Sequence, residues 1–339
     1  MPKVNLKSLT KTELTAFVES LGEKPFRAAQ LWSWLYNKGA ASFEAMTNLS
    51  KTFRQTLDSV SEIRSLSLER KTLSGFSDTQ KFLWRLDDGM KIESVCIPEP
   101  DRTTICISSQ VGCALGCTFC ATGRMGFRRN LEAHEIVDQV LCVRRETSMQ
   151  PTNVVVMGMG EPLLNYENVM RALQVLNDPE AIAIGHRRIT VSTAGIVPGI
   201  RRMAEEGRPY RLAVSLNAAI DDLRTLLMPV NKTYPVDEVI RAVRFYTAKT
   251  KKRVTFEYVL LKGINDSPGE ADRLLKLLKG LPCKVNLIAF NPTKGKFERP
   301  GAEHVRAFAE RIKSLQAPVN LRLSRGDDID AACGQLAAG

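Results

Sequence analysis

The 339-residue sequence lacks the run of roughly 20 apolar residues that a membrane-spanning helix needs. Its first residues, MPKVNLKSLTKTEL, also lack the apolar centre of a secretory signal. We therefore expect a cytoplasmic protein with no membrane partner. Histidine is scarce as well, at three residues, so a mechanism that needs several imidazoles has few candidates.

The composition is otherwise that of a soluble globular protein, with 44% hydrophobic and 25% charged residues. Eight cysteines in a reducing compartment favour ligands or reactive thiols over a disulfide framework. The formal net charge of +11 suits a polyanionic partner such as RNA, because lysine and arginine neutralise phosphates. A basic but merely soluble surface explains the charge equally well.

The first ninety residues differ in pattern from the rest. Residues 10–22 and 25–39 place apolar side chains three and four apart, which predicts helices. Residues 79–100 alternate apolar and polar side chains around Asp88-Gly89, which predicts a hairpin. We predict that residues 1–90 form a small helical accessory domain with a linker hairpin, and that this domain is a candidate for RNA binding.

Residues 91–339 repeat strand, turn and helix, which predicts an α/β fold with a parallel sheet. The helix expected at residues 131–146 follows a candidate cap, Asn130, and a closing edge strand is expected within residues 320–328. Polar and glycine-rich signals follow the strands, which favours a partial (β/α)6 TIM-like barrel with its active site at the carboxyl ends of the strands. The predicted strands are residues 103–110, 153–160, 187–193, 211–217, 253–261 and 284–291.

The most specific motif is Cys113-Ala-Leu-Gly-Cys117-Thr-Phe-Cys120, after the first barrel strand. Three thiolates on one tight loop can bind three irons of a [4Fe-4S] cluster and leave the fourth iron open. Zinc is the alternative, although a structural zinc site normally takes four protein ligands, and no second Cys or His pair has matching spacing.

This spacing resembles the signature of the radical S-adenosylmethionine (SAM) superfamily, in which the open iron binds SAM. The second strand ends in Met157-Gly158-Met159-Gly160-Glu161-Pro162, which resembles the GGEP-type motif of that superfamily. A carboxylate at a strand end can receive the ammonium group of SAM. The resemblance implies SAM contacts at Gly160, Glu161, Ser192, Ser215, Leu216, Asn217 and Asn291.

Residues 106–131 and 324–336 are similar to the bacterial dual-specificity rRNA and tRNA adenine-C2 methyltransferases, and the resemblance covers nearly the whole chain. It implies that Cys333 takes a methyl group from one SAM, and that a radical from a second SAM activates this group for addition to C2. Cys106 then resolves the protein–RNA adduct as a disulfide, and Glu93 matches an acidic position proposed for proton handling. Asn217 departs from the family, because many members carry His there.

The implied partners are 23S rRNA, tRNA and an electron donor such as flavodoxin or ferredoxin, and we expect a monomer. Basic residues that could form a rim around the barrel mouth are Arg124, Arg128, Arg129, Lys251, Lys252, Arg253, Lys294, Lys296 and Arg299. Two alternatives stay open from the sequence. One is adenine-C8 methylation, and the other is a non-catalytic RNA-binding protein with a metal cluster.

Overall fold

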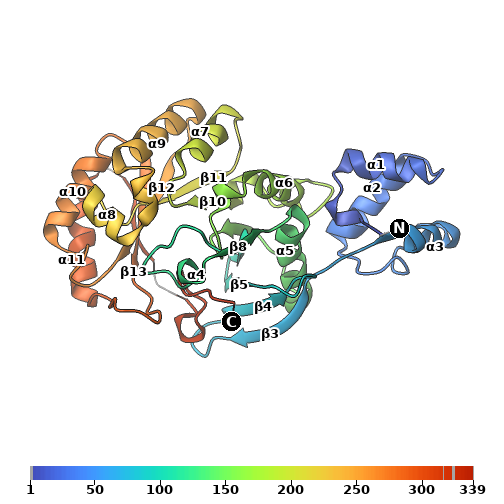
Figure 1. The fold of residues 1–339 in the computed structure, drawn as a ribbon, viewed down its shortest axis with the longest axis horizontal. Helices are drawn as coiled ribbons and strands as arrows, with labels where there is room; N and C mark the ends of the chain where they lie inside the picture. Colours follow the sequence, from blue (N-terminus) through green and yellow to red (C-terminus); the bar gives the residue numbers. More distant parts are fainter. Residues whose placement is uncertain (1–2, 316, 323–324, 339) are drawn as a thin grey trace.

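The structure is a computed structural model that describes residues 3–315, 317–322 and 325–338. A small helical region at the amino terminus lies beside a curved sheet whose outer face is covered by helices (Figure 1). The inner face of this sheet is the side that the carboxyl-terminal tail reaches.

The amino-terminal region is helical, as predicted. Its first long helix begins with a capping box, in which the Thr10 hydroxyl accepts a hydrogen bond from the Glu13 amide and the Glu13 carboxylate accepts one from the Thr10 amide. The elements of this region are β1 (Val4–Asn5), α1 (Lys11–Ser20), α2 (Phe26–Trp32), α3 (Lys51–Val60) and β2 (Ser61–Glu62).

A ten-stranded sheet forms the rest of the framework, in the order β14-β13-β12-β11-β10-β9-β6-β5-β4-β3. Strands β6 and β9–β14 run parallel to one another, and the partial barrel predicted from the sequence is confirmed. The parallel strands are β6 (Arg102–Cys106), β9 (Asn153–Val156), β10 (Ile189–Thr193), β11 (Arg211–Ser215), β12 (Val254–Leu260), β13 (Cys283–Ala289) and β14 (Val319–Arg322).

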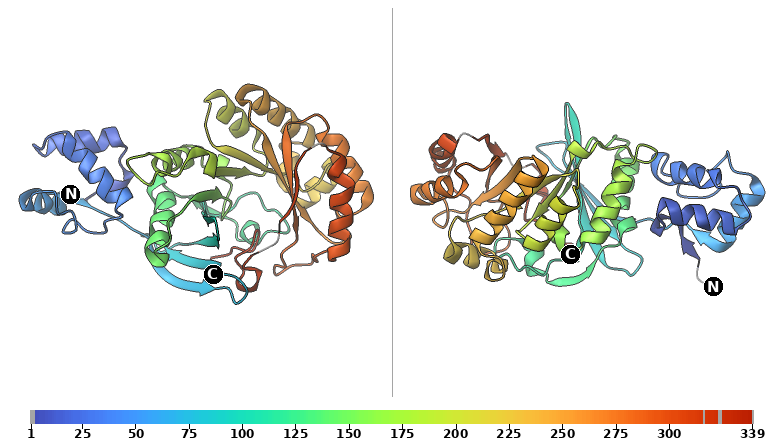
Figure 2. Two further views of the ribbon diagram at one scale, coloured as in Figure 1. Left: turned by 180° about the vertical axis from the view of Figure 1, so that it is seen from behind. Right: turned by 90° about the horizontal axis from the view of Figure 1, so that it is seen from above.

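Helices connect the parallel strands on the outside of the sheet (Figure 2). The prediction that Asn130 caps α5 is wrong. The helix begins after Glu132, which forms a capping box with Glu135. Asn130 instead ends strand β8 and accepts a hydrogen bond from Gln110. The helices are α4 (Ala121–Arg124), α5 (Ala133–Thr147), α6 (Tyr166–Asn177), α7 (Val197–Glu205), α8 (Asp221–Leu227), α9 (Val236–Thr250), α10 (Pro268–Leu278) and α11 (Ala302–Ile312).

The predicted edge strand is present as β14, at the edge of the sheet, and residues 323–324 of that prediction lie outside the described residues. At the opposite edge, β3 (Ser67–Leu73), β4 (Gln80–Arg85) and β5 (Lys91–Glu99) pair antiparallel. The hairpin turn predicted at Asp88-Gly89 joins β4 to β5, and Gly89 has a φ of +81° there. The predicted domain boundary after residue 90 thus falls inside this hairpin, and the division into two domains stays a prediction.

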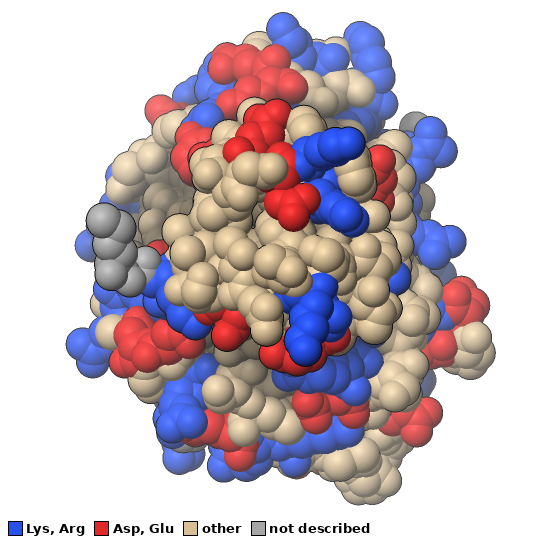
Figure 3. Space-filling view, turned by 90° about the vertical axis from the view of Figure 1, so that its right-hand side faces the viewer, with Lys and Arg blue, Asp and Glu red and all other residues tan. Residues whose placement is uncertain are grey.

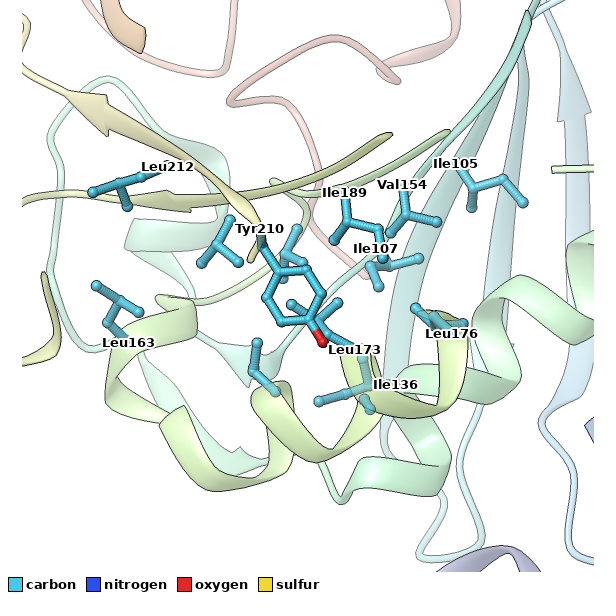
Figure 4. Packing of buried hydrophobic residues seen from close by; sticks show 14 of the residues in the cluster. Ile105, Ile107, Ile136, Val154, Leu163, Leu173, Leu176, Ile189, Tyr210 and Leu212 are labelled. Atoms are coloured by element: carbon cyan, nitrogen blue, oxygen red, sulfur yellow. The ribbon is translucent and has the colours of Figure 1, made fainter. Parts of the chain in front are cut away.

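The core between the sheet and helices α5 and α6 is apolar (Figure 4). Residues from neighbouring strands alternate, so that one side chain in two faces the helices. Almost no surface of these side chains is exposed, which stabilises the framework behind the site. The labelled residues are Ile105, Ile107, Ile136, Val154, Leu163, Leu173, Leu176, Ile189, Tyr210 and Leu212.

The amino-terminal region contacts α5 and α6 through buried polar groups. The Lys7 ammonium lies 2.7 Å from the Asp138 carboxylate, and both side chains are buried. The Trp32 indole donates a hydrogen bond to Asp178 at 3.1 Å, and the Arg144 guanidinium of α5 donates to the Tyr36 carbonyl at 3.1 Å. Burying a charge is costly unless it is paired, so these contacts specify one docking position.

Candidate active site

The three cysteines of the CxxxCxxC motif lie on a loop that closes on itself. Its base is the antiparallel pair β7 (Gln110–Gly112) and β8 (Phe127–Asn130), and the Cys113 amide donates to the Gly126 carbonyl at 3.0 Å. Gly112 has a φ of +74°, and a Cβ there would lie 1.8 Å from the Gly126 oxygen. Glycine is therefore required at residue 112 for this closure.

The thiols of Cys113, Cys117 and Cys120 are half-buried and not joined in disulfides. Burial raises the pKa of the Cys113 thiol to about 11 and also raises the pKa of the Cys117 thiol, and negative charge on the neighbouring thiols adds to both shifts. Within the described residues, no three His, Cys, Asp or Glu side chains are arranged to hold a single metal ion. Three thiols crowded on one loop are the donor set for three irons of a cubane cluster, so the residues fit the cluster.

Gly160 and Glu161 follow β9 and lie beside this loop. A Cβ on Gly160 would lie 2.5 Å from the Gln110 Cβ, so the backbone must pass without a side chain. The Glu161 carboxylate is buried and accepts hydrogen bonds from the amides of Leu163, at 3.0 Å, and Ala194, at 2.7 Å. Burial raises the pKa of Glu161 to about 7. Each carboxylate oxygen has a second lone pair, so the predicted contact with an ammonium group remains open to it.

The other predicted SAM contacts fall into two groups. Ser192 on β10 and Ser215 at the end of β11 are half-buried. Leu216 and Asn217 are buried, and the Asn217 amide group is already bonded, since its Oδ1 accepts from the Val259 amide at 2.8 Å. Asn217 also has a φ of +58°, a conformation that Asn tolerates better than most residues. The structure thus gives Asn217 a role in shaping the strand end, and its contact with SAM stays a prediction.

Cys106 and Cys333 come together although they are distant in sequence. Burial raises the pKa of the Cys106 thiol to about 12, and the neighbouring Cys333 contributes to this rise. Burial also raises the pKa of Cys333, to which negative charge at Glu257 and at Cys120 of the cluster loop adds. Cys333 has accessible surface, although protein groups surround its sulfur closely enough to raise its pKa. The two thiols therefore lie near each other and near the predicted cluster ligands.

The tail that carries Cys333 is fastened to the cluster loop and to the loop after β13. The Ala121 amide donates to the Gly334 carbonyl at 2.7 Å, and the Thr122 hydroxyl donates to the Leu336 carbonyl at 2.6 Å. The Asn291 side chain donates to the Cys333 carbonyl at 3.2 Å. Asn291 was predicted as a SAM contact, and in this conformation its amide holds the tail.

Glu93, the predicted proton acceptor, also binds the tail. Its Oε2 accepts a hydrogen bond from the Ala337 amide at 2.9 Å, and its Oε1 lies 3.3 Å from the Lys81 ammonium. Lys81 in turn donates to the Asp330 carbonyl at 3.2 Å. Lys81 and Glu93 thus hold both ends of the segment that carries Cys333, which Figure 1 shows (red) beside the hairpin of β3 and β4.

The predicted basic rim is only partly present. Lys251, Lys252 and Arg253 lie at the amino end of β12, so they are at the opposite end of the barrel from the cluster loop, and this part of the prediction is wrong. Arg129 is engaged by Glu135 and Asp88. On the face toward the amino-terminal region, basic and acidic side chains alternate around uncharged surface, without a continuous basic patch (Figure 3).

Sequence patterns missed three groups that shape the site. Arg224 is fully buried and donates to the carbonyls of Leu216, at 3.1 Å, and Ala194, so it joins the ends of β10 and β11. Lys81 and Glu257 are the other two groups that the sequence patterns missed. None of them belongs to a motif, and the only signal was a charged residue within or beside an apolar segment, which is unusual in a buried strand.

Comparison with known proteins agrees with this geometry. Residues 4–63 match the family model of the ribosomal RNA large subunit methyltransferase N-terminal domain, and residues 107–275 match the radical SAM superfamily. The chain is 48% identical to the dual-specificity RNA methyltransferase RlmN of Syntrophobacter fumaroxidans, over 100% of this chain and 99% of that protein. The chain belongs to the dual-specificity RNA methyltransferase RlmN family. Its RlmN relative in Marinobacter nauticus is 46% identical over 98% of this chain and 92% of that protein.

The crystal structure of a related protein has the same fold as this chain. The crystal structure of a radical SAM methyltransferase from Sphaerobacter thermophilus has a TM-score of 0.95, with 47% identity over 99% of this chain and 100% of that one. The protein is therefore a radical SAM RNA methyltransferase that uses a [4Fe-4S] cluster and SAM. The non-catalytic alternative is wrong for a member of this family. None of the described helices is long and apolar enough to span a membrane.

Proposed function

We propose that this protein methylates C2 of an adenine in 23S rRNA and in tRNA through a methyl-cysteine on Cys333, with two SAM used per turnover. The observation that carries the proposal is that Cys106, Cys333 and the cluster loop are neighbours, with the tail that carries Cys333 hydrogen-bonded to the end of that loop. The names of the relatives support a dual-specificity RNA substrate. The family model at residues 4–63 supports ribosomal RNA.

We propose complementary tasks for the Cys333 thiol on the tail and the Cys106 thiol at the end of β6. Cys333 sulfur forms a bond to the methyl group of SAM, whose sulfur leaves with the electron pair, and the thiol proton is released. When bound, the cluster would supply the electron that cleaves a second SAM, and the radical so formed would take a hydrogen atom from the methyl group on Cys333, which then adds to C2. Once the adduct has lost one electron, which would return to the cluster, and the C2 proton, Cys106 attacks the Cys333 sulfur and the bond between that sulfur and the methylene carbon breaks. The carbon keeps the electron pair and takes a proton to become the methyl group, and the disulfide that remains must be reopened by an external thiol reductant.

Glu93 is proposed as the group that accepts the proton from C2. Because its Oε2 binds the Ala337 amide and its Oε1 faces Lys81, the carboxylate is covered in this conformation. We propose that the tail shifts between methyl loading and proton transfer, which uncovers Oε2. Such a shift also brings Cys333 from SAM to the base, which must leave its stack to reach the thiol.

Partners and location follow from the same reaction. Cleavage of SAM needs a one-electron donor, for which we propose a flavodoxin or a ferredoxin. We also propose that the protein acts as a monomer in the cytoplasm.

The test is an anaerobic assay of the reconstituted protein with rRNA or tRNA, SAM and a reductant, followed by nucleoside mass spectrometry. The expected product is 2-methyladenosine in both RNAs, with 5′-deoxyadenosine formed alongside. If the product is 8-methyladenosine, the protein methylates C8 of adenine and not C2. The absence of any methylated adenosine, despite a cubane spectrum and cleavage of SAM, would overturn the proposal.

A further inference from the structure

The loop between β3 and β4 presents a phenylalanine ring to solvent. The Phe76 side chain is 90% exposed, which is the largest exposure of any large hydrophobic side chain among the described residues. Exposed apolar side chains are common on protein surfaces, so exposure alone does not mark a contact site. Two further features distinguish Phe76: the hydrogen bonds that hold its loop in shape, and the place of that loop beside the tail.

Hydrogen bonds within the loop fix the backbone that carries Phe76. The Ser74 hydroxyl oxygen accepts from the amides of Phe76 and Ser77, each at 3.2 Å. The Ser77 hydroxyl lies 3.0 Å from Thr79 Oγ1, and the Ser74 amide donates to the Thr79 carbonyl at 3.0 Å. Short polar side chains that bond to the backbone of their own turn stabilise its shape. The ring is therefore held outward by a preorganised loop, which lowers the entropy cost of covering it with a ligand.

The same loop is bonded to the tail that carries Cys333. The Asp328 carboxylate accepts hydrogen bonds from the Ser74 hydroxyl and from the Gly75 amide, both at 2.8 Å. Phe76 directly follows these two residues, so its ring lies beside the tail, which Figure 1 shows next to the hairpin of β3 and β4. An RNA strand held against the tail would therefore lie within reach of the ring.

We infer that the Phe76 ring stacks on a nucleobase of the substrate RNA, beside the adenine that is methylated. The inference rests on the proposed function, in which that adenine leaves its stack to reach Cys333. The bases next to a flipped adenine lose a stacking partner, and an aromatic side chain can replace it. Asp78, Asp328 and Asp330 on the loop and the tail are exposed and repel phosphates, so the contact is with a base and not with the RNA backbone.

The test measures binding of an unmodified tRNA transcript to the reconstituted protein by filter binding at several salt concentrations. Phe76→Ala should bind about tenfold more weakly, as for the loss of one stacked base. The dependence of affinity on salt should stay the same, because the ring neutralises no phosphate. Phe76→Leu, which keeps an apolar side chain without a ring, should lose nearly as much affinity, and Phe76→Trp should bind at least as tightly as the wild type.

A second measurement follows the ring position itself. In Phe76→Trp, stacking on a base should quench the indole fluorescence when tRNA is added, beyond any change in the wild type. Met90→Trp and Met90→Ala are the matched controls, because Met90 is also exposed but lies in the turn at the other end of β4, and they should show neither this quench nor weaker binding. Phe76→Ala that binds tRNA as tightly as the wild type, or an equal quench in both Trp variants, would overturn the inference alone. Wild-type protein that neither binds nor methylates tRNA or rRNA would instead count against the proposed function.

Discussion

The amino-terminal region and the carboxyl-terminal tail both pack against the barrel, but by different physical means. The amino-terminal region docks through the buried pair of Lys7 and Asp138 and through the Trp32 indole, which donates a hydrogen bond to Asp178. The tail, residues 325–338, is held by hydrogen bonds to its backbone and by partly exposed ion pairs of its side chains, which join Asp327 to Arg299 and Arg325 to Glu99. Its buried side chains are small or few, with Ala331, Ala332 and Leu336 among them.

This difference separates a fixed part from a movable one. Removing a buried charge from its partner is costly, so the amino-terminal region keeps one position. A segment held by hydrogen bonds can exchange them for water at a small net cost. The proposed shift of the tail falls where the chemistry needs it, because Cys333 must reach SAM first and the RNA base afterwards.

Removing the thiol of the tail is expected to have the largest effect on activity. Cys333→Ala should yield no detectable 2-methyladenosine, because the proposed acceptor of the methyl group is removed, while the melting temperature stays near that of the wild type. Cys283→Ala is the control, since that thiol is buried on β13 and should leave the product unchanged. Methylation that survives in Cys333→Ala would show that the tail does not carry the methyl group.

Breaking the buried ion pair should have the largest effect on stability. Lys7→Met leaves Asp138 charged and unpaired, and we expect a loss of about 3–5 kcal/mol in the free energy of unfolding. Denaturant titration measures it. The double variant Lys7→Met/Asp138→Leu should recover most of the loss, because it removes both charges. A Lys7→Met variant as stable as the wild type would contradict the role of this pair.

Removing one tail contact should affect the tail alone. Thr122→Val leaves the Leu336 carbonyl without its donor, which costs about 1–3 kcal/mol locally, so Cys333 should react with iodoacetamide about tenfold faster. Peptide mass spectrometry of the reconstituted protein measures the rate at Cys333. Thr250→Val, which removes a similar hydroxyl contact within α9, is the control and should leave the rate unchanged. An unaltered rate in Thr122→Val would mean that the tail opens by another route.

The smallest effect is expected at Lys81. Lys81→Met removes the contacts with the Asp330 carbonyl and with the buried Glu93 carboxylate. Among the described residues, the hydrogen bond to Asp330 is what joins Lys81 to the tail, and such a bond contributes about 1 kcal/mol, so Cys333 alkylation should rise by up to about fivefold. Lys71→Met on β3 is the control, because Lys71 contacts Glu146 and not the tail. A slower reaction in Lys81→Met would contradict the proposed fastening.

The framework of the fold could be predicted because its signals are local. Apolar β-branched segments such as residues 153–156 predict buried strands, and the spacing of Cys113, Cys117 and Cys120 marks the cluster loop. The cap of α5 was predicted wrongly because Asn130 satisfies a local rule, while Glu132 and Glu135 supply the actual capping box.

The fastening of the tail could not be predicted, because it joins residues that only the tertiary fold brings together. Glu93 matches a proton-handling position, yet its bond to the Ala337 amide depends on where the tail lies after β14. Likewise, the burial of Asn217 depends on its partner Val259 in a neighbouring strand. Sequence patterns report the face of a strand, and they do not report which distant backbone group meets it.

The most direct test of the account is to follow a methyl group through Cys333. The reconstituted protein is incubated with SAM that carries a deuterated methyl group, and the peptide with Cys333 is analysed by mass spectrometry before and after RNA and reductant are added. We predict labelled methyl-Cys333 first, followed by its loss as labelled 2-methyladenosine appears. Labelled RNA formed while Cys333 never acquires the label would contradict the central claim.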